Sequence, residues 1–166
     1  MADVLLAYPA ASDATITLAS LATDANLLTG VESAAISNTT NKYLDYLISG
    51  KIRTGTSPTT AKAIQVWAVA SWDGTNWPDV FDGTASAETI TSANHKNAIC
   101  RLVAEMVTDA TSDRDYHFAG VSIRDLFGGV VPPAFVLFVT HSTVAALNAT
   151  AGNHQIRIQG VYETVA

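Results

Sequence analysis

The C-terminal part of the chain limits the fold more than any other segment. Residues 135–139 are apolar without interruption, and residues 154–163 alternate between apolar and polar side chains. Alternation with a period of two is typical of a strand with one buried face, and here it directs Ile156, Ile158 and Tyr162 toward the core. An unbroken apolar run fits a strand that is covered on both faces. We therefore expect residues 135–139 to form a central strand or to lie against another subunit.

Similar signals recur along the rest of the chain. Alternating or β-branched segments predict strands at residues 13–18, 31–37, 42–54, 62–71 and 115–122. Asp-Gly, a strong turn signal, occurs twice in the loop that follows the fourth of these segments. Many short strands with turn-rich connections predict an all-β fold, and we expect a single-domain antiparallel β-sandwich.

Residues 97–107 fit two patterns. Ile99, Leu102 and Val103 match the spacing of a helix, whereas every second residue from Cys100 would share one face of a strand. The local pattern slightly favours a helix, but the surrounding strands and turns favour β-structure. We predict a strand here.

Composition excludes some classes of function. Charged residues make up 14% of the chain, well below the usual quarter, and the formal net charge is −6. This charge argues against direct binding of nucleic acid, which needs a basic surface. No apolar run approaches the roughly 20 residues that cross a bilayer, so we expect no membrane association. The start of the chain lacks the features of a signal peptide, which favours synthesis in the cytoplasm.

Residue types that carry catalysis do not form a motif. The four histidines show no metal-binding spacing, although strands can bring His117, His141 and His154 together. Cys100 lies among apolar residues, as expected for a small buried side chain rather than a nucleophile. The acidic residues between Asp73 and Asp82 do not fit a calcium loop and are common in turns. We expect neither an enzyme nor a bound metal or cofactor.

Aromatic residues gather in one loop. Trp72, Trp77 and Phe81 lie within ten residues of one another, among turn-forming residues. Exposed aromatic rings on a β-sandwich can stack on sugar rings, and buried ones can close one end of the sandwich. Both interpretations are carried forward, and the second is preferred.

The N-terminus is apolar and ends in a proline. We treat residues 1–12 as an arm and residues 13–166 as the β-sandwich domain. Apolar side chains in such an arm would be poorly placed in water, so we expect the arm to pack on a neighbouring subunit or on a larger shell. The candidate interface residues are those of the arm and of the apolar run: Val4, Leu5, Leu6, Tyr8, Phe135, Leu137 and Val139.

The order of several short motifs resembles small structural proteins of tailed-bacteriophage virions. From about Ala14 to the end, the resemblance rests on segments 41–46, 66–67, 71–74, 110–118, 126–133, 136–143 and 152–157. It implies a jelly-roll-like sandwich that decorates or cements the head shell, or a structural protein of the head–tail junction or tail. It transfers no catalytic residue.

The same resemblance implies partners and a location. The expected partners are the major capsid protein or another shell protein, and further copies of this chain as a homotrimer. The expected location is the virion, after synthesis in the bacterial host. A carbohydrate-binding module, based on the aromatic loop, is the alternative from a different class.

Overall fold

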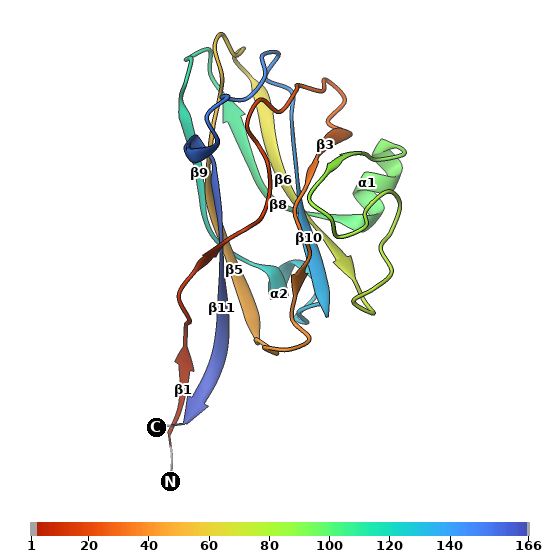
Figure 1. Cartoon of the computed structure of the whole chain (residues 1–166), viewed down its shortest axis with the longest axis vertical. Coiled ribbons are helices and arrows are strands. Elements are labelled where there is room, and N and C mark those ends of the chain that lie inside the picture. The colour runs from red at the N-terminus through yellow and green to blue at the C-terminus, as the bar shows by residue number, and fades with distance from the viewer. Residues whose placement is uncertain (1–2, 166) are drawn as a thin grey trace.

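The structure is a computed structural model that describes residues 3–165, and two antiparallel sheets pack face to face in it (Figure 1). The first sheet has the order β1 (Val4–Ala7), β11 (Gln155–Val165), β5 (Asp45–Arg53) and β9 (Asp115–Ser122), and β2 (Ser12–Asp13) also pairs with β11. The second has the order β7 (Ala87–Thr89), β3 (Thr29–Glu32), β10 (Ala134–His141), β6 (Lys62–Ser71) and β8 (Cys100–Thr108), and β4 (Ile36–Ser37) also pairs with β10. Connections include α1 (Ala93–Ile99), α2 (Ile123–Leu126) and a 3-10 turn, η1 (Ala151–Asn153). The predicted all-β antiparallel sandwich is confirmed.

Strand β10 lies in the middle of the second sheet and is buried along its whole length. Phe135, Leu137 and Val139 face the first sheet and are 0% exposed. They are covered by their own chain and offer no surface to a partner. The interpretation of these three residues as interface candidates is corrected on this point. Of the two explanations for the apolar run, the central strand is the one that the structure contains.

The outer face of β10 is covered by the chain as well. Val136 and Phe138 pack there in a second apolar cluster, which includes Phe81 and Ile90. The Phe81 and Phe138 rings meet edge to face, with their centroids 5.5 Å apart. The segment between β6 and β8, which contains β7 and α1, therefore closes the outside of this sheet (Figure 1).

Residues 97–107 contain the end of a helix and most of a strand. Helix α1 begins after Ser92, whose hydroxyl accepts a hydrogen bond from the His95 N–H, and it ends at Ile99. From Cys100 onward the chain pairs with β6 along the whole of β8. The predicted strand is thus confirmed from Cys100 and wrong for residues 97–99. Ser92 is a favourable N-cap residue, and the strand prediction did not take into account this signal for a helix before β8.

The predicted strand at residues 13–18 is extended but forms little ladder. Ile16 is partly buried and Leu18 is buried, while Thr17 is exposed, so the predicted alternation is present. The N–H of Ala14 donates to Ile156 in the first sheet, and the carbonyl of Thr15 accepts from Ala34 beside the second sheet. One hydrogen bond to each sheet lets this segment cross between them without becoming a strand of either.

The inward-facing prediction is wrong for Tyr162, which is 37% exposed. The pairing of β11 with β5 ends at Val161, and Tyr162 already pairs with β1 in the part of the first sheet that extends past the sandwich. Within residues 3–165, no helix is long and apolar enough to cross a membrane.

Candidate functional site

A two-stranded ribbon projects from the body of the sandwich (Figure 1). Strand β1 pairs with the last four residues of β11, from Ala7 opposite Tyr162 to Val4 opposite Val165. The other neighbour of β11 is β5, and that pairing ends at Val161. Beyond Val161 the two terminal segments therefore have only each other as strand partners among the described residues.

Exposed apolar side chains lie on both faces of this ribbon, and one face also contains Glu163, opposite Leu6. Directly opposed residues share a face, so Val4, Leu6 and Val165 line one side, with exposures of 63%, 61% and 68%. Leu5 and Tyr162 line the other side, with exposures of 50% and 37%. A two-stranded ribbon is marginally stable in water by itself. Exposed apolar strands with free edges mark sites of association.

Aromatic rings fix the base of the ribbon. The ring of Tyr43 lies over Gly160, where an added Cβ would come within 2.5 Å of ring carbons. Tyr43 also packs against Tyr162 at a centroid distance of 6.1 Å and against Tyr46 at 5.3 Å. The Gln159 side chain donates to the carbonyl of Pro9 at 3.1 Å, which ties the arm to β11. The ribbon therefore leaves the sandwich at a fixed place.

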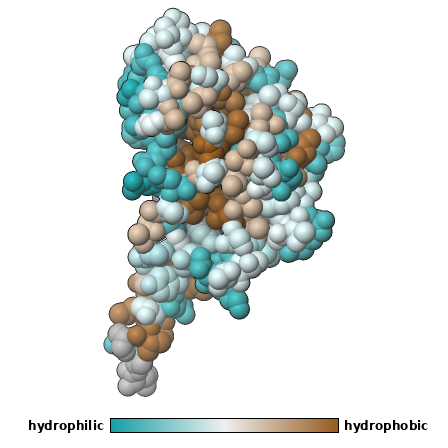
Figure 2. Space-filling view, viewed as in Figure 1, coloured by the Kyte–Doolittle hydropathy of each residue, from teal (hydrophilic) through white to brown (hydrophobic). Residues whose placement is uncertain are grey.

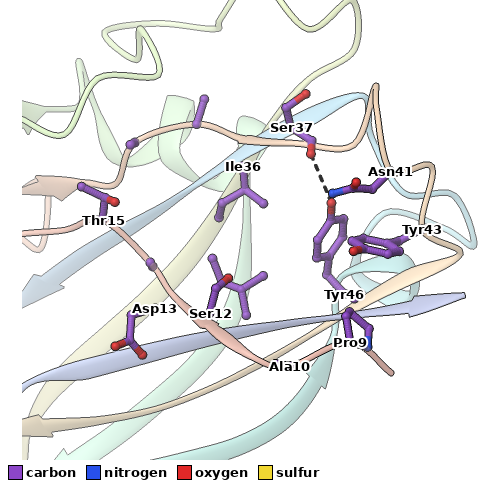
Figure 3. A pocket seen from close by; sticks show the side chains of 15 residues that line it. Pro9, Ala10, Ser12, Asp13, Thr15, Ile36, Ser37, Asn41, Tyr43 and Tyr46 are labelled. Carbon is purple, nitrogen blue, oxygen red and sulfur yellow. Dashed lines mark hydrogen bonds between the residues drawn. The ribbon is translucent and has the colours of Figure 1, made fainter. Parts of the chain in front are cut away.

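A hollow with a mixed polar and apolar lining opens beside this base, in the gap between the two sheets. Its polar lining residues are Ser12, Asp13, Thr15, Ser37 and Asn41. Figure 2 shows hydrophobic side chains inside a depression on this face, and Figure 3 shows Ile36 and Ser12 approaching it from opposite sides. Its volume is about 280 Å³. The apolar part of its lining consists of Pro9, Ala10, Ala14, Ala34, Ala35, Ile36, Tyr43, Tyr46, Ile158 and Gly160.

Tyr46 stiffens the wall of this hollow. Its hydroxyl lies 3.2 Å from the Ser37 carbonyl, a hydrogen bond that Figure 3 shows, and also 3.2 Å from the Asn38 Oδ1. Burial raises the pKa of Tyr46 to about 12, so the side chain stays protonated and keeps this donor. A second hollow of about 300 Å³ lies on the far side of Asp13 and Ala14, which line both. The segment that crosses between the sheets thus has a recess on each side, lined by polar and apolar residues.

The arm predicted at residues 1–12 supplies β1, one strand of this ribbon, and the first residue of β2; its residues 1 and 2 lie outside the described residues. Val4, Leu5, Leu6 and Tyr8 are exposed, as the predicted interface requires, but the pairing of β1 with β11 was not foreseen. The predicted boundary between residues 12 and 13 falls inside β2, which pairs with β11. A strand with one face in water usually has a polar residue at every second position. The three consecutive apolar residues at positions 4–6 lack this pattern, and they were the sequence signal for a strand with two apolar faces.

The aromatic loop divides between core and surface. Phe81 is buried and plugs the outer cluster of the second sheet. Trp72 is 58% exposed and meets Phe127 edge to face at 5.9 Å. Trp77 is partly buried, and with Trp72 and Phe127 it lines an open recess of about 590 Å³ that also contains Arg101. The end-plug interpretation suits Phe81, and only the two tryptophans remain open to a ligand.

The histidines and the cysteine do not meet in a site. His141 is buried and hydrogen-bonded to Thr143 Oγ1 and the Leu21 carbonyl, each at 2.9 Å, and burial lowers its pKa. His154 bonds to the Asn148 carbonyl at 2.8 Å. Burial raises the pKa of the Cys100 thiol to about 12, which keeps it protonated. Within the described part of the chain, no three His, Cys, Asp or Glu side chains are grouped to hold a metal ion.

The acidic residues of the aromatic loop serve the loop itself. Asp73 Oδ1 accepts from the N–H groups of Thr75 and Asn76, and these bonds, with one from the Asn76 side chain, hold the pKa of Asp73 far below its usual range. Asp79 accepts from Thr91 in the same manner. These carboxylates are turn-forming groups, as the sequence indicated.

Sequence reasoning missed two buried charged groups. Glu32 is 0% exposed and accepts from the N–H of Gly83 at 2.6 Å; burial raises its pKa to about 7. Lys96 is 5% exposed, donates to the Leu27 carbonyl and to Gln65, and lies 4.5 Å from the ring centroid of Trp67. Burial lowers the pKa of Lys96 to about 8. Both groups hold loops against the outer face of the second sheet.

Comparison with known proteins assigns this chain to no family. No family model matches the chain, and no curated protein matches it. A solved structure with a similar arrangement is described as the structure of infectious bursal disease virus Gx strain, with a TM-score of 0.33 and 14% sequence identity. The alignment covers 99% of this chain and 41% of that one, so this chain spans less than half of the length of its structural neighbour.

Proposed function

We propose that this chain is a non-enzymatic structural protein of a virus particle, which decorates or cements the head shell of a tailed bacteriophage. The observation that carries the proposal is the projecting ribbon, whose apolar side chains Val4, Leu5 and Leu6 are at least half exposed. Such a surface needs a protein partner. The order of the sequence motifs resembles that of phage structural proteins. This resemblance is the reason for proposing a virion as the assembly that contains the partner.

The function follows from contact alone. Each copy contributes a rigid sandwich and one docking ribbon, and many copies bound side by side link neighbouring shell subunits. Multivalent attachment strengthens the whole layer beyond any single contact. The partners in this proposal are the major capsid protein and further copies of the chain, and the location is the virion.

Cryo-electron microscopy of purified particles that contain this chain tests the proposal. We expect density for the sandwich at regular positions on the outside of the shell. Density only at the head–tail junction or along the tail would replace decoration with a different structural role. Absence of the chain from purified particles would overturn the proposal.

A ribbon variant sharpens the test. Leu5→Asp with Leu6→Asp places charges on both faces of the ribbon and leaves the sandwich core untouched. We expect this double variant to be lost from particles. Val130→Asp is the matched control, because Val130 is a similarly exposed apolar residue outside the ribbon. If both variants are incorporated into particles equally well, the ribbon is not the surface that attaches the chain to the shell.

A carbohydrate-binding function is the second candidate, favoured by the exposed indole of Trp72. Its recess also contains the Trp77 indole and the charged Arg101 side chain, a mixture that suits stacking and hydrogen bonding to a sugar. A glycan array with Trp72→Ala, Trp77→Ala and the aromatic-preserving Trp72→Phe tests it. We expect binding to survive only in Trp72→Phe. No binding by the unmodified chain, or binding that both alanine variants retain, would reject it.

A further inference from the structure

Three side chains on the outer face of the second sheet surround the carboxamide of Gln65. Its Oε1 accepts a hydrogen bond from the Lys96 Nζ at 2.9 Å and another from the Trp67 Nε1 at 3.1 Å. Its Nε2 donates to the Glu105 Oε2 at 2.5 Å. Two donors on the oxygen and an acceptor on the nitrogen fix the carboxamide in one orientation. The group is therefore held between an amine and a carboxylate.

The fold brings these residues together from three elements. Gln65 on β6 lies directly opposite Glu105 on β8 in the ladder. Trp67 follows two residues later on β6, and its hydrogen bond to Gln65 places both side chains on the same face. Lys96 comes from α1, which covers this face, and is only 5% exposed. Water is thus largely excluded from the amine but not from the whole cluster.

Lys96 has the properties of a buried nucleophile. Its Nζ donates to the Leu27 carbonyl at 2.6 Å, which anchors the amine beside the carboxamide. Burial lowers its pKa to about 8, and the ionisable groups Cys100, Asp24 and Glu105 act in the opposite direction but less strongly. A neutral amine has the lone pair that attacks a carbonyl carbon, and removal from water is a common way to activate a lysine.

We propose that Lys96 and Gln65 form an isopeptide bond within the chain, with Glu105 as the group that moves the proton. The neutral Nζ attacks Cδ of the carboxamide and gives a tetrahedral adduct. Nζ then loses one proton, Nε2 gains one, and the Cδ–Nε2 bond breaks to release ammonia. A primary amide and an amine become a secondary amide and ammonia, so the reaction needs no oxidant, reductant or cofactor.

The neighbours of the carboxamide suit each step. In the adduct both nitrogens are bonded to Cδ, so the Glu105 carboxylate beside Nε2 also lies near Nζ and can carry the proton from one to the other. The Trp67 N–H donates to Oε1, where negative charge develops. Glu105 is exposed, so ammonia can leave to solvent on its side of the cluster.

The bond closes a covalent loop between β6 and α1. The two linked residues are 31 positions apart, and the segment between them contains Phe81 and Ile90, which cover the outer face of β10. A cross-link of this kind restricts the unfolded chain and so favours the folded state. The reaction occurs once in each chain, and it does not depend on the proposed function.

Mass spectrometry of the intact, denatured chain tests the bond. We expect the purified chain to be lighter than its sequence mass by one molecule of ammonia, and fragmentation of a protease digest to find a branched peptide that joins Lys96 to Gln65. Conversion should become faster from pH 6 to pH 9, because the amine loses its proton over this range. A chain that keeps its full mass after prolonged incubation at pH 9 would overturn the inference.

Lys96→Arg is the matched control. Arginine keeps the positive charge and the hydrogen-bond donors, but it stays protonated and cannot attack the carboxamide. We expect this variant to keep the full mass of its sequence under all these conditions. If Lys96→Arg also loses ammonia, another side chain is the source and the inference is wrong.

A second pair of variants tests the role of the carboxylate. Glu105→Gln keeps a hydrogen-bond acceptor beside Nε2 but cannot carry a proton, so we expect bond formation to become slower by on the order of a hundredfold. Glu88→Gln changes a glutamate on β7, at the opposite edge of the same sheet, and should react at the rate of the unmodified chain. Equal rates in the two variants would refute proton transfer by Glu105.

Discussion

Strand β10 and the β1–β11 ribbon both have many apolar side chains, but those of β10 are buried and those of the ribbon are exposed to solvent. Phe135 to Val139 are 0% exposed, covered by the first sheet on one side and by the loops before β8 on the other. Val4, Leu5 and Leu6 are 50–63% exposed, because the ribbon continues past the end of the sandwich. The apolar side chains of a strand therefore indicate that another layer should bury them. Only the position of the strand in the fold decides whether that layer belongs to the same chain.

The largest expected effect is on the covered strand. Phe138 lies at the centre of the outer cluster, in contact with Phe81. Replacing it with alanine leaves a cavity, so we expect Phe138→Ala to lower the free energy of unfolding by about 3–5 kcal/mol. Urea denaturation followed by circular dichroism measures this. A change below about 1 kcal/mol would mean that the outer cover is loose and that the two regions differ less than the exposures indicate.

The cover of β10 should also depend on pH through Glu32. This residue lies opposite Phe138 in the ladder and accepts from the Gly83 and Asp82 N–H groups of the covering loop. Burial, with smaller contributions from the charges of Asp82 and Glu88, raises its pKa from 4.5 to about 7. The folded chain then binds more protons than the unfolded chain between these values, so stability falls as pH rises from 4.5 to about 7 and levels off above it.

The variant Glu32→Gln isolates this effect. At roughly 1.4 kcal/mol per pKa unit, the loss attributable to Glu32 has an upper limit on the order of 3 kcal/mol. The buried His141 and the partly buried His154, whose pKa values are lowered, act in the opposite direction at low pH and are common to both proteins. The stability of the unmodified chain relative to Glu32→Gln should therefore fall from pH 5 to pH 8 by the contribution of Glu32 alone. Parallel curves at pH 5 and pH 8 would contradict the assignment.

The boundary between covered and uncovered strand is at Gly160. A Cβ there would meet the Tyr43 ring at 2.5 Å, so we expect Gly160→Ala to cost about 1–3 kcal/mol by overpacking. Gly152→Ala is the matched control, because no atom lies within 4 Å of its added Cβ. Thermal unfolding of the two variants compares them. Equal midpoints would show that Tyr43 moves away freely and that the base of the ribbon is not fixed.

The smallest expected effect is on the ribbon itself. Leu6 is 61% exposed, so Leu6→Ala should change the unfolding free energy of the monomer by no more than about 0.5 kcal/mol. The measurement is urea denaturation at a protein concentration where light scattering shows monomers. A loss similar to that of Phe138→Ala would place the ribbon in the chain's own core and remove the contrast.

Much of the fold could be predicted from periodicity. The bounds of β6 and β9 agree with the predicted segments, and the apolar run became the central strand. Errors occurred where a local pattern had no opposing layer, as at Tyr162, or where a helical turn preceded a strand, as at residues 97–99. Periodicity records which side chains share a face, but it does not record where the facing sheet ends.

The candidate site was predicted in part. The exposed arm was expected from Val4-Leu5-Leu6, but its pairing with the C-terminus depends on the two ends meeting in space. The recess could not be predicted, because its walls come from residues far apart in the sequence, such as Ala14, Ile36 and Ile158. Glu32 and Lys96 were missed because burial of a charge is a property of the surrounding loops.

The sequence by itself determined that this is an all-β chain with few charges, an apolar N-terminal arm and an apolar strand at residues 135–139, because these properties depend on composition and on a period of two residues. Only the tertiary structure decided which apolar strand is covered. Burial is set by the layer that lies opposite, and in this molecule the second sheet ends before the ribbon begins.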